Sequence, residues 1–200
     1  MGETFPMETG AYLVRLARRQ IEERLGKKDA PLEKPPSALL QKNMGAFVTL
    51  HTFKPRELRG CIGYIEPFMP LGRAVRECAL HAAFEDGRFP PVQKGELENI
   101  VVEVSVLTPP VRIKVKSPPG CLKKIEIGKD GLVLEAGNLK GVFLPQVPLE
   151  QGWGVEECLS NLCLKAGVPA DYWLWGNAKL YKFHTHIFCE EKPNGKIVKP

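Results

Sequence analysis

The sequence contains no uninterrupted apolar run long enough to cross a membrane. Its first residues, Met1 to Pro6, lack the basic segment and the apolar segment of a signal peptide. A dense basic block with interleaved aromatic residues is also absent, although the formal net charge is +5. We therefore expect a cytoplasmic protein that does not insert into a membrane and is not built to bind nucleic acid.

The sequence also lacks a Cys-x-x-Cys motif, and its six cysteines are irregularly spaced: Cys61, Cys78, Cys121, Cys158, Cys163 and Cys189. In a reducing compartment such cysteines are free thiols, and most serve as small core residues. His184 and His186 have the spacing of metal ligands on one strand face, but no third ligand accompanies them in the sequence. The sequence therefore predicts no metal site and no cofactor.

What the sequence does contain is the length and composition of one globular domain. Its 200 residues, 44% of them apolar and 26% charged, suffice to bury a core. Apolar residues at helical spacing predict helices over residues 9–25, 70–85 and 154–166. Alternating apolar residues predict strands over residues 45–51, 58–64, 100–107, 122–127, 132–134, 140–144 and 179–189. Because helices and strands mix without a regular βαβ rhythm, we expect an α+β fold with a mainly antiparallel sheet and flanking helices.

Local signals mark where some of these elements begin or turn. Thr9 is expected to cap the first helix. Residues 45–64 are expected to form an antiparallel hairpin. An Asp130-Gly131 turn is expected to join residues 122–127 to residues 132–134 in a second hairpin.

The most informative stretch is Leu58-Arg59-Gly60-Cys61-Ile62-Gly63, which places a thiol between two glycines in a strand. Alternate side chains of a strand project from the same face, so Arg59 and Cys61 are expected to stand side by side. Gly60 and Gly63 remove side chains that would shield the backbone, which marks a place where a ligand or another backbone segment comes close. The stretch therefore predicts a site built around a thiol and a guanidinium.

Two interpretations of Cys61 remain open. As a nucleophile, it would have Arg59 to favour the thiolate, His81 of the second helix as base and Glu103 to orient that histidine. As a structural residue, it would be a small buried thiol, with Arg59 paired to Glu103 or Asp86.

A similar choice concerns Trp153, Trp173 and Trp175. The three indoles would either stack on a ring-bearing ligand or pack in a core. Core packing is the favoured interpretation, because large aromatic side chains dominate the energetics of cores.

Seven stretches, in the same order along the chain, resemble the AMMECR domain, a family named after a human chromosomal region and widespread in archaea and bacteria. Each stretch is weak by itself, but the ordered series is specific. The family loop normally reads Asp-Pro-Arg-Phe, where this chain has Asp86-Gly87-Arg88-Phe89. The stretches are GAFVTL (45–50), LRGCIG (58–63), RFPPV (88–92), EVSVLTPP (103–110), GKDGL (128–132), LPQV (144–147) and CLKAG (163–167).

The resemblance implies a single domain over residues 1–200, folded as two unequal lobes with a cleft between them. The larger lobe would contain residues 8–117 with 172–191, and the smaller lobe residues 118–171. On the matching motifs, the residues expected to bind a substrate are Arg59, Gly60, Gly63, Arg88 and Gln146.

Relatives in the family are encoded beside, or fused to, Memo-like proteins, which resemble extradiol dioxygenases, and radical-SAM proteins. The resemblance therefore implies a protein partner of one of these kinds. Our first hypothesis is an enzyme with Cys61 as nucleophile. The second is a non-enzymatic regulatory or scaffold module that binds the partner and uses Arg59 and Cys61 for recognition. Regulation linked to nucleic acid rests only on the mild basicity and is the weakest hypothesis.

Overall fold

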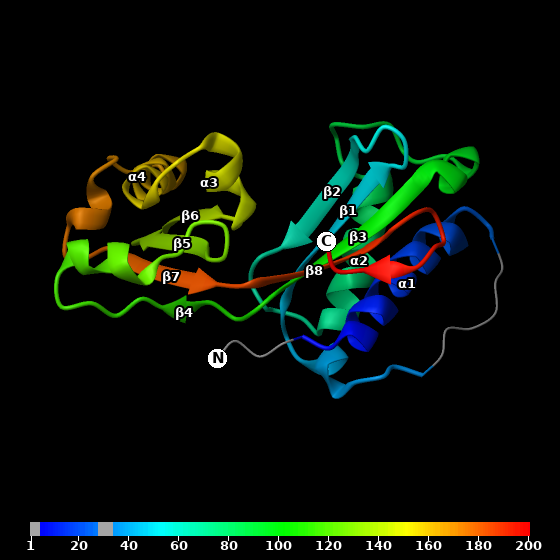
Figure 1. Ribbon diagram of the computed structural model, residues 1–200, viewed down its shortest axis with the longest axis horizontal. Coiled ribbons are helices and arrows are strands. Elements are labelled where there is room, and N and C mark those ends of the chain that lie inside the picture. The colour runs from blue at the N-terminus through cyan, green and yellow to red at the C-terminus, as the bar shows by residue number, and fades with distance from the viewer. Residues whose placement is uncertain (1–4, 28–33) are drawn as a thin grey trace. The chain divides into compact units, whose positions relative to one another are not determined.

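The computed structural model describes residues 5–27 and 34–200 (Figure 1). The chain divides into two compact units, Met1–Leu107 with His186–Pro200 and Thr108–Thr185. The predicted smaller lobe, residues 118–171, is shorter than the second unit and lies within it. Helices together with two antiparallel sheets confirm the predicted α+β fold.

Within the described residues, the first unit is built on a sheet with the strand order β2-β1-β3-β8-β9. The middle strand β1 pairs antiparallel with β2 and with β3, which confirms the predicted hairpin over residues 45–64. The strands are β1 (Gly45–Thr52), β2 (Leu58–Tyr64), β3 (Ile100–Leu107), β8 (Thr185–Glu190) and β9 (Ile197–Val198). The helices are α1 (Met7–Arg24) and α2 (Leu71–Phe84), with short 3-10 turns η1 (Ala38–Gln41) and η2 (Lys94–Asn99).

The two faces of this sheet differ in character. Val48 of β1 and its cross-strand partner Val104 of β3 are fully buried, and they belong to a core that α1 and α2 complete. Figure 1 shows both helices on this one side of the sheet. The residues that alternate with these core residues form the opposite side, here called the distal face: Phe47, Thr49, His51, Cys61, Gly63, Glu103 and Ser105.

The second unit is built on a four-stranded antiparallel sheet with the order β4-β7-β5-β6. Leu134 of β5 and Leu159 of α4 are fully buried in its separate core, beside Trp173. The elements are β4 (Val111–Arg112), η3 (Pro118–Lys124), β5 (Gly131–Ala136), β6 (Leu139–Phe143), α3 (Gln146–Gln151), α4 (Val155–Lys165), η4 (Tyr172–Leu174) and β7 (Lys179–Phe183). Among the described residues, none of the helices has the length and apolarity required to cross a membrane.

Three local predictions were wrong. Thr9 is buried inside α1, whose N-cap is Pro6. Residues 122–127 do not form a strand, because the prolines at the start of η3 favour a 3-10 turn that runs to Lys124. The closing strand, residues 179–189, divides into β7 and β8, which join different sheets. A strand pattern read locally cannot show this division, since alternation continues through both strands.

Candidate functional site

The backbone of Cys61 is held by a loop rather than by a strand on its outer side. β2 is the edge strand of the described sheet, so none of the described strands pairs with its outer side. The Cys61 N–H donates to Asp86 Oδ2 at 2.9 Å, and Arg88 Nη2 donates to the Cys61 carbonyl oxygen at 3.1 Å. The Asp86–Arg88 pair thus completes the hydrogen bonding of β2 at the thiol and fixes the backbone there.

Asp86 and Arg88 bind each other as well as β2. Arg88 Nε and Nη2 donate to the Asp86 carboxylate at 2.9 and 2.7 Å, and the Arg88 backbone N–H donates at 3.2 Å. These hydrogen bonds hold the pKa of Asp86 well below its usual range and raise the pKa of Arg88. The pair forms with Gly87 between its two members.

Arg59 has a carboxylate partner that neither interpretation of the sequence named. Its guanidinium donates from Nε and Nη2 to Glu96 of η2 at 2.8 and 3.1 Å, which lowers the pKa of Glu96. A register shift in the β1–β2 pairing, between Leu50 and His51, interrupts the strict alternation at Arg59. Arg59 is therefore committed to Glu96 instead of standing free beside the thiol.

The two glycines of the motif admit close approach by the protein itself. A Cβ at Gly60 would lie 2.1 Å from the carbonyl oxygen of Ala82 in α2, and one at Gly63 would lie 2.2 Å from the ring of Phe47. The expected close approach at these positions is made by a helix backbone and a neighbouring aromatic side chain. Both glycines therefore bring other parts of the first unit close to β2.

Replacing Gly60 by alanine is expected to destabilise the protein by about 1–3 kcal/mol, because the carbonyl of Ala82 is backbone and cannot rotate away. Urea unfolding of Gly60→Ala and wild type measures this difference. Gly87→Ala is the matched control, since no atom lies within 4 Å of the added Cβ. Equal stability of the two variants would contradict the close packing of α2 on β2.

On the distal face, Thr49 stands between the thiol and a carboxylate. It lies opposite Cys61 of β2 on one side and opposite Glu103 of β3 on the other. The Thr49 hydroxyl donates to Cys61 Sγ at 3.3 Å. Cys61 and Glu103 are therefore about two strand spacings apart, roughly 10 Å, with Thr49 between them.

His51 lies two residues further along β1 on the same face. Its Nδ1 is buried and has no hydrogen-bond partner among the described residues. Burial lowers the pKa of His51, and the positive charge of Arg56 lowers it further. The imidazole is therefore neutral at physiological pH, and its Nδ1 is an unpaired polar atom inside the protein.

Glu103 differs from an ordinary surface glutamate. Burial raises the pKa of its carboxyl group, and the nearby Arg56 guanidinium opposes that shift only in part. Arg56 itself is exposed in the turn that joins β1 to β2. His51 and Glu103 thus put an imidazole with a lowered pKa and a carboxyl with a raised pKa on the face that carries Cys61, and the Arg56 cation acts on both.

Glu103→Gln is expected to stabilise the protein at pH 7. A carboxyl whose pKa is raised on folding contributes stability that is fully present below the pKa of the unfolded chain and is lost as pH rises through the pKa of the folded state. Glutamine removes the cost of the buried charge, so the gain should shrink as pH falls toward about 4, the unfolded value. Urea unfolding at both pH values measures it, with exposed Glu98→Gln as control. A gain that grows on acidification would contradict the assignment.

His81 is not brought to the thiol. It lies on α2, where Nδ1 is 3.3 Å from the Tyr64 hydroxyl and Nε2 is 3.6 Å from Glu85. Because α2 packs on the core side of the sheet and Cys61 faces the distal side, the sheet separates them. The histidine on the face of Cys61 is His51.

The remaining sequence candidates lie elsewhere. Gln146 begins α3 in the second unit and is exposed. His184 Nε2 is 3.1 Å from Asp130, whereas the His186 ring stacks on Phe5 with centroids 5.7 Å apart. The two histidines therefore have separate partners. Within the described residues, no group of three or more His, Cys, Asp or Glu side chains could hold a metal ion.

Sequence reasoning missed Thr49, His51 and Arg56. The signal for the first two was present in the alternation of residues 45–51, since an antiparallel hairpin places every second residue of one strand on the face of its partner's cysteine. Arg56 offered no periodic signal, because it lies in a turn.

The chain and its two-sheet fold belong to a known class of protein. The family model AMMECR1 matches residues 14–188, so the chain belongs to the AMMECR1 family. It is 51% identical over 192 residues to Protein MJ0810 of Methanocaldococcus jannaschii, covering 96% of this chain and 95% of that protein. It is 46% identical over 198 residues to Protein MK0488 of Methanopyrus kandleri, covering 98% and 96%.

A solved structure has the same fold. The crystal structure of the uncharacterized protein PH0010 from Pyrococcus horikoshii matches with a TM-score of 0.81 and 48% sequence identity, and the match covers 96% of this chain and 97% of that one. The names of these relatives state no activity and no partner.

Proposed function

We propose that the protein is an enzyme that uses Cys61 as a thiol nucleophile on the distal face of the first unit. The observation that carries this proposal is the row of Cys61, Thr49 and Glu103 across three adjacent strands, with His51 beside it. Cys61 is partly exposed, whereas the five other cysteines are buried. All six thiols are free, and we place the protein in the reducing cytoplasm.

Each group near Cys61 has a chemical role in this proposal. The Thr49 hydroxyl orients the sulfur, and the neutral imidazole of His51 acts as the base. The sequence alone predicts His81 in the role of base. Glu103, whose pKa burial raises, binds a polar part of the substrate two strands away from the thiol. Exposed Arg56 binds an anionic part of the substrate.

For an acyl donor, the sulfur would form a bond with the carbonyl carbon while the bond to the leaving oxygen breaks. His51, which takes the proton from the thiol, would pass it to that oxygen. Water would then hydrolyse the thioester, which releases the carboxylic acid and restores the thiol of Cys61. The roughly 10 Å between Cys61 and Glu103 leaves room for the substrate above Thr49.

The alternative is a non-enzymatic module that binds a protein partner of the Memo-like or radical-SAM kind. One observation favours it: the hydrogen bond at Cys61 Sγ comes from a hydroxyl and not from a base. In that case Cys61 and the half-exposed side chain of Arg88 would be recognition residues.

The turnover of p-nitrophenyl acetate tests the enzyme proposal. We expect release of many equivalents of p-nitrophenolate, an acetyl group on Cys61 detected by mass spectrometry, and loss of turnover in Cys61→Ala. Glu98→Gln, which changes an exposed carboxylate outside the row of Cys61, Thr49 and Glu103, should leave the rate unchanged. A single equivalent of p-nitrophenolate without turnover, or an active Cys61→Ala variant, would reject catalysis by Cys61 and favour the module.

A further inference from the structure

The second unit contains a pocket that is not part of the proposed catalytic site. Its volume is about 300 Å³, and all of its lining residues lie between Arg112 and Leu180. The lining comes from the segment after β4, from Cys121 of η3, from the residues around η4 and from β7. This volume is at the small end of the range typical of sites for small molecules.

One side of the pocket is apolar and aromatic. Ile113, Cys121, Leu180 and Trp173 are each at most 9% exposed. Trp175 is 46% exposed and lies at the pocket, with its ring 5.0 Å from that of Tyr172. Rigid indoles beside a buried apolar floor suit the face of a planar ring.

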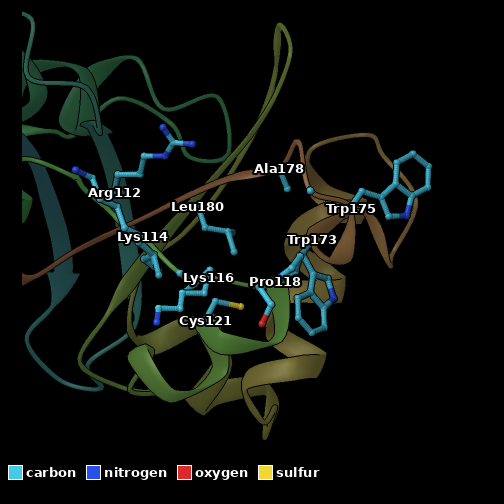
Figure 2. A pocket seen from close by; sticks show the side chains of 13 residues that line it. Arg112, Lys114, Lys116, Pro118, Cys121, Trp173, Trp175, Ala178 and Leu180 are labelled. Atoms are coloured by element: carbon cyan, nitrogen blue, oxygen red, sulfur yellow. The ribbon is translucent and has the colours of Figure 1, made fainter.

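The other side carries three cations. Arg112, Lys114 and Lys116 recur at every second residue along one side of the pocket, and Figure 2 shows their exposed side chains pointing outward from it in different directions. No hydrogen bond or ion pair joins the side chain of any of the three to the part of the chain that the structure describes. By contrast, Lys124 Nζ donates to the Lys114 carbonyl at 2.5 Å.

A second cavity extends this cationic side. It is lined by Lys114, Val115, Lys116, Ser117, Gly120 and Lys124. Carboxylates are missing from the lining of both cavities, as far as the described residues define it. Several like charges without a counter-ion repel one another, and a bound anion relieves that repulsion.

We propose that this pocket binds a small molecule of the nucleoside monophosphate class, with one planar ring and one phosphate group. The ring packs against Trp173 and Trp175, and the phosphate is bound by Arg112, Lys114 and Lys116, whose exposed side chains turn toward it. The enclosed volume suits a single nucleotide and not a nucleic acid strand. The proposal is independent of Cys61, because the pocket lies wholly within residues 108–185.

Titrations of the full chain with AMP, adenosine and inorganic phosphate test this proposal by calorimetry and by the indole N–H signals in NMR spectra. The three tryptophans separate the pocket from its surroundings. Trp173 and Trp175 line it, whereas Trp153 packs against Phe143 with ring centroids 5.7 Å apart. We expect AMP to shift the signals of Trp173 and Trp175 but not that of Trp153, and to bind at least about 10-fold more tightly than adenosine or phosphate.

Two variants test which side chains bind the phosphate of the ligand and which bind its ring. Lys114→Gln combined with Lys116→Gln should weaken AMP about 10-fold and leave adenosine unchanged, whereas Trp175→Ala should weaken both. Lys123→Gln is the control for loss of a nearby surface charge, since Lys123 is exposed and does not line the pocket. Absence of AMP binding at about 1 mM, an equal loss in Lys123→Gln, or tighter, steeply salt-dependent binding of single-stranded DNA would each overturn the proposal.

Discussion

Cys61 is expected to react with iodoacetamide at least about 100-fold faster than any other cysteine of the native protein. The five other thiols are buried and react only when the structure opens, which costs at least about 3 kcal/mol for core residues. Burial also raises the pKa of Cys78 to about 12 and that of Cys158 to about 11, so few thiolates form there at neutral pH. Mass spectrometry of the peptides at successive times measures each rate.

The reaction in denaturant is the control for this experiment. There all six thiols are exposed and should react at similar rates. Thr49→Val, which removes the hydroxyl that donates to Sγ at nearly constant volume, shows whether that hydrogen bond affects the native rate. If Cys61 reacts as slowly as Cys78 in the native protein, the thiol is closed to reagents and the proposal of a nucleophile fails.

Glu190→Gln is expected to destabilise the protein by about 3 kcal/mol, the low end of the range for breaking a buried ion pair. Glu190 and Arg18 are 3% and 5% exposed, and they join β8 to α1 by two hydrogen bonds of 2.5 Å. Glu190 also accepts the Val102 N–H of β3 at 3.0 Å. Glutamine leaves the charge of Arg18 buried, although Glu22 at 3.8 Å offsets a part of the loss. Urea unfolding measures the change.

An exposed pair on the same helix gives the comparison. Glu23 lies 2.8 Å from Arg19, and its side chain is 47% exposed. Glu23→Gln should therefore change the stability by less than about 1 kcal/mol. Replacing Arg18 by methionine and Glu190 by leucine together should recover much of the stability lost in Glu190→Gln, because no unpaired charge remains. Equal effects of Glu190→Gln and Glu23→Gln would show that the buried pair is not what joins β8 to α1.

The hairpin of β1 and β2 and the long strand β3 were predictable because strand periodicity is local. The apolar alternation of residues 45–51 and 100–107 already fixed which side chains share a face once the strands pair. The motif around Cys61 was likewise visible, since a thiol between glycines stands out in any strand. The division of residues 179–189 between two sheets was not visible, because each half has the same pattern.

The sequence by itself determined the strands of the first unit, the placement of Cys61 on one face of β2 and the likeness to a known family. Tertiary structure alone decided which groups surround the thiol. The helix α2 could pack on either face of the sheet, and its packing on the core side removed His81 from Cys61. The pairing register placed Thr49, His51 and Glu103 on the face of the sheet that carries Cys61. The register shift beside His51 interrupts the alternation at Arg59, whose guanidinium binds Glu96. These contacts depend on residues far apart in the chain, which no local pattern specifies.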